Sequence, residues 1–147
     1  MTARRISIAL GLVAAVSTLA VAAGYVVRWL RVPVYREPPI SQPEYFFIAG
    51  VIAVLALMEA MLALRRSDSL RVLAMPAVAG IIVVTGFSAA MGFDEVGYWL
   101  LFTGAVGLLA AVFAATETPR HVIHALLGLI SALPLAVALG LVQRLLR

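Results

Sequence analysis

Glu59 is the residue of this sequence with the clearest capacity for chemistry, because it is the only formally charged residue inside its long apolar stretches. A carboxylate within a bilayer costs roughly a few kcal/mol unless it is protonated, paired or able to reach the surface. Glu59 lies about 7 Å by helical rise from the end of its stretch at Leu64, so water or an arginine is expected to reach it. Pairing with an arginine of this chain or of a partner is favoured, and a proton or ion role is the alternative.

The two histidines, His121 and His124, are three residues apart at one end of the last apolar stretch. A haem with two histidine ligands needs them on opposite faces of the porphyrin, usually from two helices, which neighbours on one helix do not provide. A metal pair would lack an obvious third or fourth ligand. The sequence therefore favours packing or interfacial histidines and predicts neither a cofactor nor a metal.

Small residues recur at four-residue spacing in the last two apolar stretches, a pattern that lets helix backbones approach closely in lipid. The expected packing rows are Gly128, Ala132, Ala136 and Gly140 in the last stretch, and Gly107, Ala111 and Ala115 in the one before it. Such rows predict contacts with another helix, either in this chain or in a larger subunit.

Motifs of enzymes and of self-contained carriers are missing from the sequence. It contains no HExxH, P-loop or GxSxG pattern, no Ser/His/Asp set and no Cys. Nor does it show the interrupted helices and inverted repeat of a complete transporter. The chain is therefore expected to be an accessory subunit and not an enzyme.

The elements that position these residues are five apolar stretches, each near or above the roughly 20 residues that a helix needs to cross a bilayer. Hydrophobic residues make up 64% of the 147-residue chain, and the segments between stretches are too short for a soluble core. The sequence predicts one all-α, polytopic membrane domain covering residues 1–147. The expected spans are 6–27, 45–64, 72–93, 96–116 and 122–142.

The ends of the spans give the expected orientation. The first span is interpreted as retained, because about 22 apolar residues exceed the core of a signal peptide. Asp68 or Ser69 is expected to cap the third span. Six arginines lie on the N-terminal side and five on the other, while every Tyr and Trp gathers at the opposite boundary, so the N-terminus is predicted to be cytoplasmic.

The net charge of +4 comes from arginine alone, since the chain has no Lys. Arginines that flank spans account for the sequence pI near 10.3. No nucleic-acid partner is therefore expected.

In this layout the chain resembles the small membrane subunit of the tripartite tricarboxylate transporters, which are bacterial secondary carriers that depend on a solute-binding protein. The matching pieces are Val32-Pro33 with Pro38 and Pro39, then Tyr45-Phe46-Phe47, Arg65-Arg66, Met91-Gly92-Phe93, and the helix from Val122 to Leu146. The sequence lacks the Gly that the family tends to carry before the Phe-Phe pair and the Pro after it.

The resemblance implies a large membrane carrier subunit as partner, which moves an organic carboxylate, and a periplasmic solute-binding protein that delivers it. The chain would be a scaffold in the inner membrane with no substrate residues of its own. One alternative is a supernumerary subunit of a respiratory or photosynthetic complex; Pro43-Glu44-Tyr45-Phe46 also resembles the cytochrome b motif Pro-Glu-Trp-Tyr, without its Trp. Another is a small channel or carrier that acts through Glu59.

Overall fold

The computed structural model describes residues 2–31, 42–66, 68–91, 95–116 and 122–145. These residues fold into five α-helices, each long and apolar enough to cross a membrane. The helices are α1 (Ala3–Leu30), α2 (Gln42–Leu64), α3 (Ser69–Met91), α4 (Glu95–Thr116) and α5 (Val122–Leu145). The predicted all-α, multi-pass fold is confirmed, and no predicted span boundary differs from a helix end by more than three residues.

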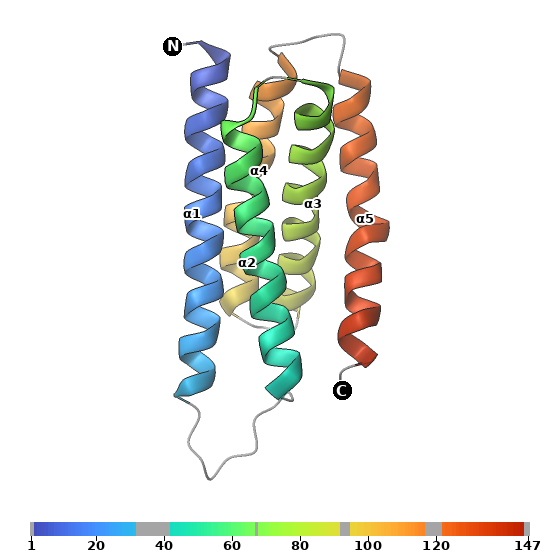
Figure 1. Ribbon diagram of the computed structural model, residues 1–147. Helices are drawn as coiled ribbons and strands as arrows, with labels where there is room; N and C mark the ends of the chain where they lie inside the picture. The colour runs from blue at the N-terminus through green and yellow to red at the C-terminus, as the bar shows by residue number, and fades with distance from the viewer. Residues whose placement is uncertain (1, 32–41, 67, 92–94, 117–121, 146–147) are drawn as a thin grey trace.

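The helices run alternately up and down, so the two ends of the chain lie at opposite ends of the molecule (Figure 1). Helices α1 to α4 form a bundle in which α1 packs on α2 and α4, while α3 packs on α4 and, less extensively, on α2. Helix α5 lies outside this bundle and packs mainly on α3, with little contact to α2 or α4. The structure is thus a four-helix bundle with one helix attached to its side.

The inward face of α1 is a stripe of small and polar residues. Its members are buried and recur every three or four positions: Ser7, Gly11, Ala14, Thr18, Ala22 and Tyr25. This spacing keeps one face of a helix with 3.6 residues per turn toward its neighbours. Large apolar side chains of α1, such as Val16 and Leu19, point outward toward the lipid.

Helices α3 and α4 approach closely enough for their backbones to touch at glycines. A Cβ atom added to Gly97 would collide with the backbone of Ala89 and Ala90, and one added to Gly104 would lie 2.9 Å from the Val83 nitrogen. Gly86 meets the backbone of α4 in the same way. In lipid, where burial from water does not drive helices together, such contacts supply the van der Waals packing that holds them.

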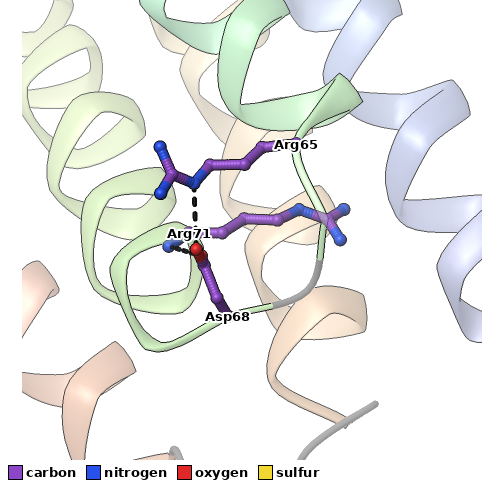
Figure 2. Close-up of polar contacts among 3 residues, drawn as sticks. All are labelled: Arg65, Asp68 and Arg71. Atoms are coloured by element: carbon purple, nitrogen blue, oxygen red, sulfur yellow. Dashed lines mark hydrogen bonds and ion pairs between the residues drawn. The ribbon is translucent and has the colours of Figure 1, made fainter.

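The α2–α3 turn fixes the start of α3 through Asp68 (Figure 2). The backbone N–H of Arg71 donates to Asp68 Oδ1 at 2.8 Å, so the carboxylate caps the helix and the predicted cap is confirmed. Arg65 Nε donates to Asp68 Oδ2 at 3.0 Å. The Arg71 N–H bond, more than the nearby arginine charges, holds the pKa of Asp68 below its usual range.

Candidate functional site

The Glu59 carboxyl group lies inside the four-helix bundle, with only 5% of the residue exposed. The Thr18 hydroxyl on α1 donates to Glu59 Oε2 at 3.0 Å. The other oxygen, Oε1, lies against Gly107 on α4, where an added Cβ atom would stand only 2.7 Å away. Among the described residues, Oε1 has no hydrogen-bond partner. Three helices therefore enclose the one acid inside the predicted spans.

Glu59 lies deeper than its position on α2 suggested. Both of its neighbours are near the middle of their own helices: Gly107 is roughly 18 Å from the start of α4 and roughly 14 Å from its end, by helical rise. The roughly 7 Å counted from Leu64 is the distance along α2 from Glu59 to the nearer end of that helix. It does not describe where Glu59 lies relative to α1 and α4. The side chain is enclosed by the described helices and only 5% of the residue is exposed.

Within the described residues, Glu59 forms no hydrogen bond or ion pair with the arginines of the α2–α3 turn, and the predicted pairing with an arginine of a partner stays a prediction. Arg65 instead forms an ion pair with Asp68 at 3.0 Å, and Arg66 is exposed at the helix end. Ala14 and Ala22, one turn to either side of Thr18, are buried small residues, so α1 presents short side chains to its neighbours around the Glu59 carboxyl. A short hydroxyl then meets the carboxyl where no long side chain has room.

A second polar cluster joins α1, α3 and α4 near the N-terminal end of the bundle. Arg71 is fully buried, and its Nη2 donates to the Ser7 hydroxyl oxygen at 2.8 Å. Ser7 in turn donates to the carbonyl oxygen of Ala110 at 2.9 Å. Figure 2 shows the Arg71 side chain extending away from the Asp68 carboxylate that binds its backbone. Arg71, which the sequence places among the arginines of the turn, is therefore part of the bundle interior.

A third polar contact ties α5 to α2 near the opposite end. Gln143 Nε2 donates to Glu44 Oε1 at 2.8 Å, and Glu44 is fully buried. Close by, the rings of Tyr25 and Tyr45 lie 5.1 Å apart between α1 and α2. Each of these tyrosines is only 8% exposed. Two of the tyrosines that the sequence places at this boundary thus pack inside the protein, whereas Tyr98 and Trp99 are exposed.

The polar clusters are separated by apolar layers. Ser7 and Thr18 lie on the same helix, roughly 16 Å apart by helical rise. The space between them holds Gly11, which meets Ala63 and Met75, and the fully buried Ala14. A proton relay through side chains needs polar neighbours at hydrogen-bond distance, and the described residues provide none across this layer. The structure does not join Glu59 to Arg71.

The predicted rows of small residues occupy different surroundings. Gly128 and Ala132 pack on α3: a Cβ atom on Gly128 would collide with the Leu73 carbonyl, and one on Gly80 would lie 2.6 Å from Ala132 Cβ. Ala136 is half-buried, and nothing lies within 4 Å of an added Gly140 Cβ. The first half of this row therefore contacts α3 of the same chain.

The row on α4 faces the bundle interior. Gly107 meets Ala79 as well as Glu59, Ala111 is buried, and Ala115 is half-buried at the end of the helix. Its role in the structure is to bring α4 close to α1 and α3.

The histidines are placed only in part. His124 is half-buried on α5, and His121 lies outside the described residues. No group of three or more His, Cys, Asp or Glu side chains within the described ranges has the geometry to hold a metal ion. No metal centre can be built from these residues.

The chain matches no protein-family model, no curated protein and no solved structure. Function must therefore be inferred from the buried polar residues and the packing around them.

Three of these buried polar residues, Ser7, Thr18 and Arg71, were not identified from the sequence as interior partners. A signal was available for the first two, because Ser7 and Thr18 lie on the regular stripe of small residues along α1. Arg71 gave no comparable signal. Its position three residues after Asp68 is equally typical of an exposed first turn, and its burial depends on the neighbouring α1 and α4.

Proposed function

We propose that this chain is an accessory scaffold subunit of the inner membrane, which packs against the large carrier subunit of a secondary transporter for organic carboxylates. A periplasmic solute-binding protein would then reach it through the complex. The N-terminus would be cytoplasmic. The layout that resembles the tripartite tricarboxylate transporters suggests this assembly, and the interior of the bundle supports a structural role.

The observation that carries the proposal is the close packing inside the bundle of α1 to α4. Added Cβ atoms at Gly11, Gly97, Gly104 and Gly107 would each meet a neighbouring helix at less than 3 Å. Contacts this close show that the helices are tightly packed around these glycines. Tight packing between helices supports a scaffold role.

A second candidate, a small carrier that acts through Glu59, is favoured by one observation. The side chain is almost fully buried near the middle of α1 and α4, and intramembrane acids in such positions are often functional. The apolar layer around Gly11 and Ala14 weighs against it, because it separates Glu59 from the polar cluster at the N-terminal end.

The proteins that co-purify with the chain distinguish between these functions. Gentle solubilisation of a tagged chain from its native membrane, followed by mass spectrometry, should recover a stoichiometric multi-span carrier subunit. Recovery of haem or quinone proteins instead would identify a supernumerary respiratory or photosynthetic subunit. Recovery of the chain alone would favour the second candidate function, a small carrier that acts through Glu59.

The variant Glu59→Gln separates the roles of the carboxyl group. The amide keeps a carbonyl oxygen that can accept from Thr18, so a scaffold should retain assembly and transport within a few-fold of wild type. Loss of transport with the complex intact would assign Glu59 to proton or ion movement. Thr116→Val, a change at an exposed site on α4, is the matched control.

A further inference from the structure

Two hollows reach the end of the bundle where α1 finishes and α4 begins (Figure 1). One is a cavity of about 730 Å³, which lies where α5 stands away from α2 and opens between these two helices. Beside its polar end lies the buried Glu44 carboxylate, which already accepts a hydrogen bond from Gln143. The other is a groove of about 500 Å³ between α1 and α4, and it is lined by an exposed carboxylate, that of Glu95.

The groove between α1 and α4 has small residues on one side and aromatic residues on the other. Helix α1 contributes residues that recur every three or four positions, chiefly small ones: Ser17, Ala20, Val21 and Gly24. Helix α4 contributes Trp99 and Phe102, which are 62% and 57% exposed. Nothing lies within 4 Å of a Cβ atom added to Gly24. The groove is therefore open toward the membrane, and its volume falls within the roughly 300–1,000 Å³ typical of ligand sites.

Glu95 and Trp99 form the polar end of this groove. They are four residues apart on α4, so their side chains lie on the same face of the helix, one turn apart. Among the described residues, Glu95 takes part in no hydrogen bond or ion pair. A carboxylate accepts strong hydrogen bonds from an ammonium group, and the face of an indole ring attracts its positive charge. The start of α4 carries only about half a positive charge from its dipole, so the full charge of Glu95 exceeds it.

Arg28 determines which kind of cation is compatible with the groove. It lines the groove at the end of α1 and already interacts within the chain, so no ligand atom is assigned to it. Its positive charge disfavours a bare organic cation at this end. In a phosphoethanolamine headgroup, a phosphate adjoins the ammonium and offsets that repulsion. A phosphoglycerol headgroup, by contrast, has no ammonium group and would bring a negative charge close to Glu95.

We propose that the groove between α1 and α4 binds phosphatidylethanolamine, with the ammonium group at Glu95 and Trp99 and an acyl chain along Gly24 and Phe102. The headgroup lies at the boundary where α1 ends and α4 begins, and the acyl chain extends toward the middle of the bundle. The lipid fills an opening between the two helices that protein side chains leave empty.

Native mass spectrometry of the full-length chain in a mild detergent tests this proposal, with phosphatidylethanolamine and phosphatidylglycerol of identical acyl chains. Phosphatidylethanolamine should be retained at a concentration about five-fold lower than phosphatidylglycerol, because only its ammonium can bind the carboxylate and the indole. Glu95→Gln should remove most of this preference, and Trp99→Leu should weaken it. Gly24→Leu should reduce retention of both lipids, because it places a large side chain where the groove is open.

Two matched controls should bind both lipids like wild type. Tyr98→Leu changes an exposed aromatic residue beside Trp99 that does not line the groove. Gly50→Leu changes an exposed glycine on α2 whose surroundings are equally open and which also lies outside the groove. Because the isolated chain is used, the result does not depend on the proposed function.

Equal retention of the two lipids by the wild-type chain would overturn the proposal. So would a preference that is unchanged in both Glu95→Gln and Trp99→Leu, or a loss of retention in Gly24→Leu that Gly50→Leu matches. Equally strong binding of glycerophosphoethanolamine, which has no acyl chain, would also overturn it by showing that the site binds a free headgroup.

Discussion

At the scale of single residues, several buried polar side chains within the bundle pair across helices. The Thr18 hydroxyl donates a hydrogen bond to Glu59. Arg71 donates to the Ser7 hydroxyl oxygen, and the Ser7 hydroxyl donates to the carbonyl oxygen of Ala110. The paired residues are 41, 64 and 103 positions apart in the sequence. An unpaired polar group in the interior of a membrane protein is costly, so these contacts specify which helix faces are neighbours.

The Thr18 hydroxyl should therefore contribute measurably to stability. Thr18→Val keeps the shape of the side chain but removes the donor to Glu59, which leaves a buried carboxyl without its partner. The expected loss is roughly 1–3 kcal/mol in the free energy of unfolding, measured by SDS titration in mixed micelles. Thr116→Val should cost much less, because Thr116 is exposed and bonds only to its own helix at Phe113. Equal effects of the two changes would contradict the assigned role of Thr18.

Asp68 should make the stability of the folded chain depend on pH in the acidic range. Its pKa in the folded chain is below the ordinary value of 3.8, mainly because the Arg71 N–H binds the carboxylate. The stabilisation is therefore complete above that ordinary value and is lost as the pH falls through the lower folded value. Asp68→Asn keeps a capping side chain but should abolish this part of the pH dependence, whereas Asp68→Ala should lower the thermal midpoint at neutral pH as well.

Thermal unfolding of these variants in detergent between pH 2.5 and pH 7 provides the measurement. Ser69→Ala, next to the cap, is the control and should keep the wild-type pH profile. A profile for Asp68→Asn that overlays the wild type would show that another group is responsible for the acid dependence.

At the scale of helices, α5 is the element with the most uneven attachment. Gly128 and Ala132 hold its first half against α3, while Gly140 near its other end lines the open cavity. The same chemical change should therefore have opposite effects along one helix. Alanine is favoured over glycine in a helix by about 1 kcal/mol when nothing obstructs the methyl group.

Gly128→Ala should lower the free energy of unfolding by roughly 1–3 kcal/mol, because the methyl group collides with the Leu73 carbonyl. Gly140→Ala should leave stability unchanged or raise it slightly. Ala132→Leu should behave like Gly128→Ala, since Gly80 leaves no room beside it, and Leu133→Ile on the exposed face should have little effect. SDS unfolding of the purified chain compares the four variants. A harmless Gly128→Ala would mean that α5 is not held at this contact.

The helices themselves could be predicted from the sequence, because span length and apolar content depend on the bilayer and not on neighbouring helices. The partners of the interior residues could not. Thr18 and Glu59 are 41 positions apart, and only the packing of α1 on α2 brings them together. The row on α5 could be recognised as a contact face, but its spacing alone did not show that α3 covers Gly128 while Gly140 faces a cavity.

At the scale of the whole molecule, the odd number of spans places the ends of the chain on opposite sides of the membrane. The arginine balance that favoured a cytoplasmic N-terminus becomes weaker once Arg71 is found inside the bundle, because five arginines then remain on each side. The exposed Tyr98 and Trp99 still lie at the end of α4 that shares a side with the end of α1. Orientation therefore depends on a direct measurement.

Cysteine labelling can make this measurement cleanly, because the chain has no cysteine of its own. Ser69 and Glu95 are exposed first residues of α3 and α4, at opposite ends of the bundle, and replacing them leaves every arginine in place. With a cytoplasmic N-terminus, Glu95→Cys should react with a membrane-impermeant maleimide in intact cells or spheroplasts. Ser69→Cys should react only after the membrane is permeabilised. The reverse pattern would place the N-terminus outside, and with it the cavity between α2 and α5 would open in the cytoplasmic leaflet instead of the outer one.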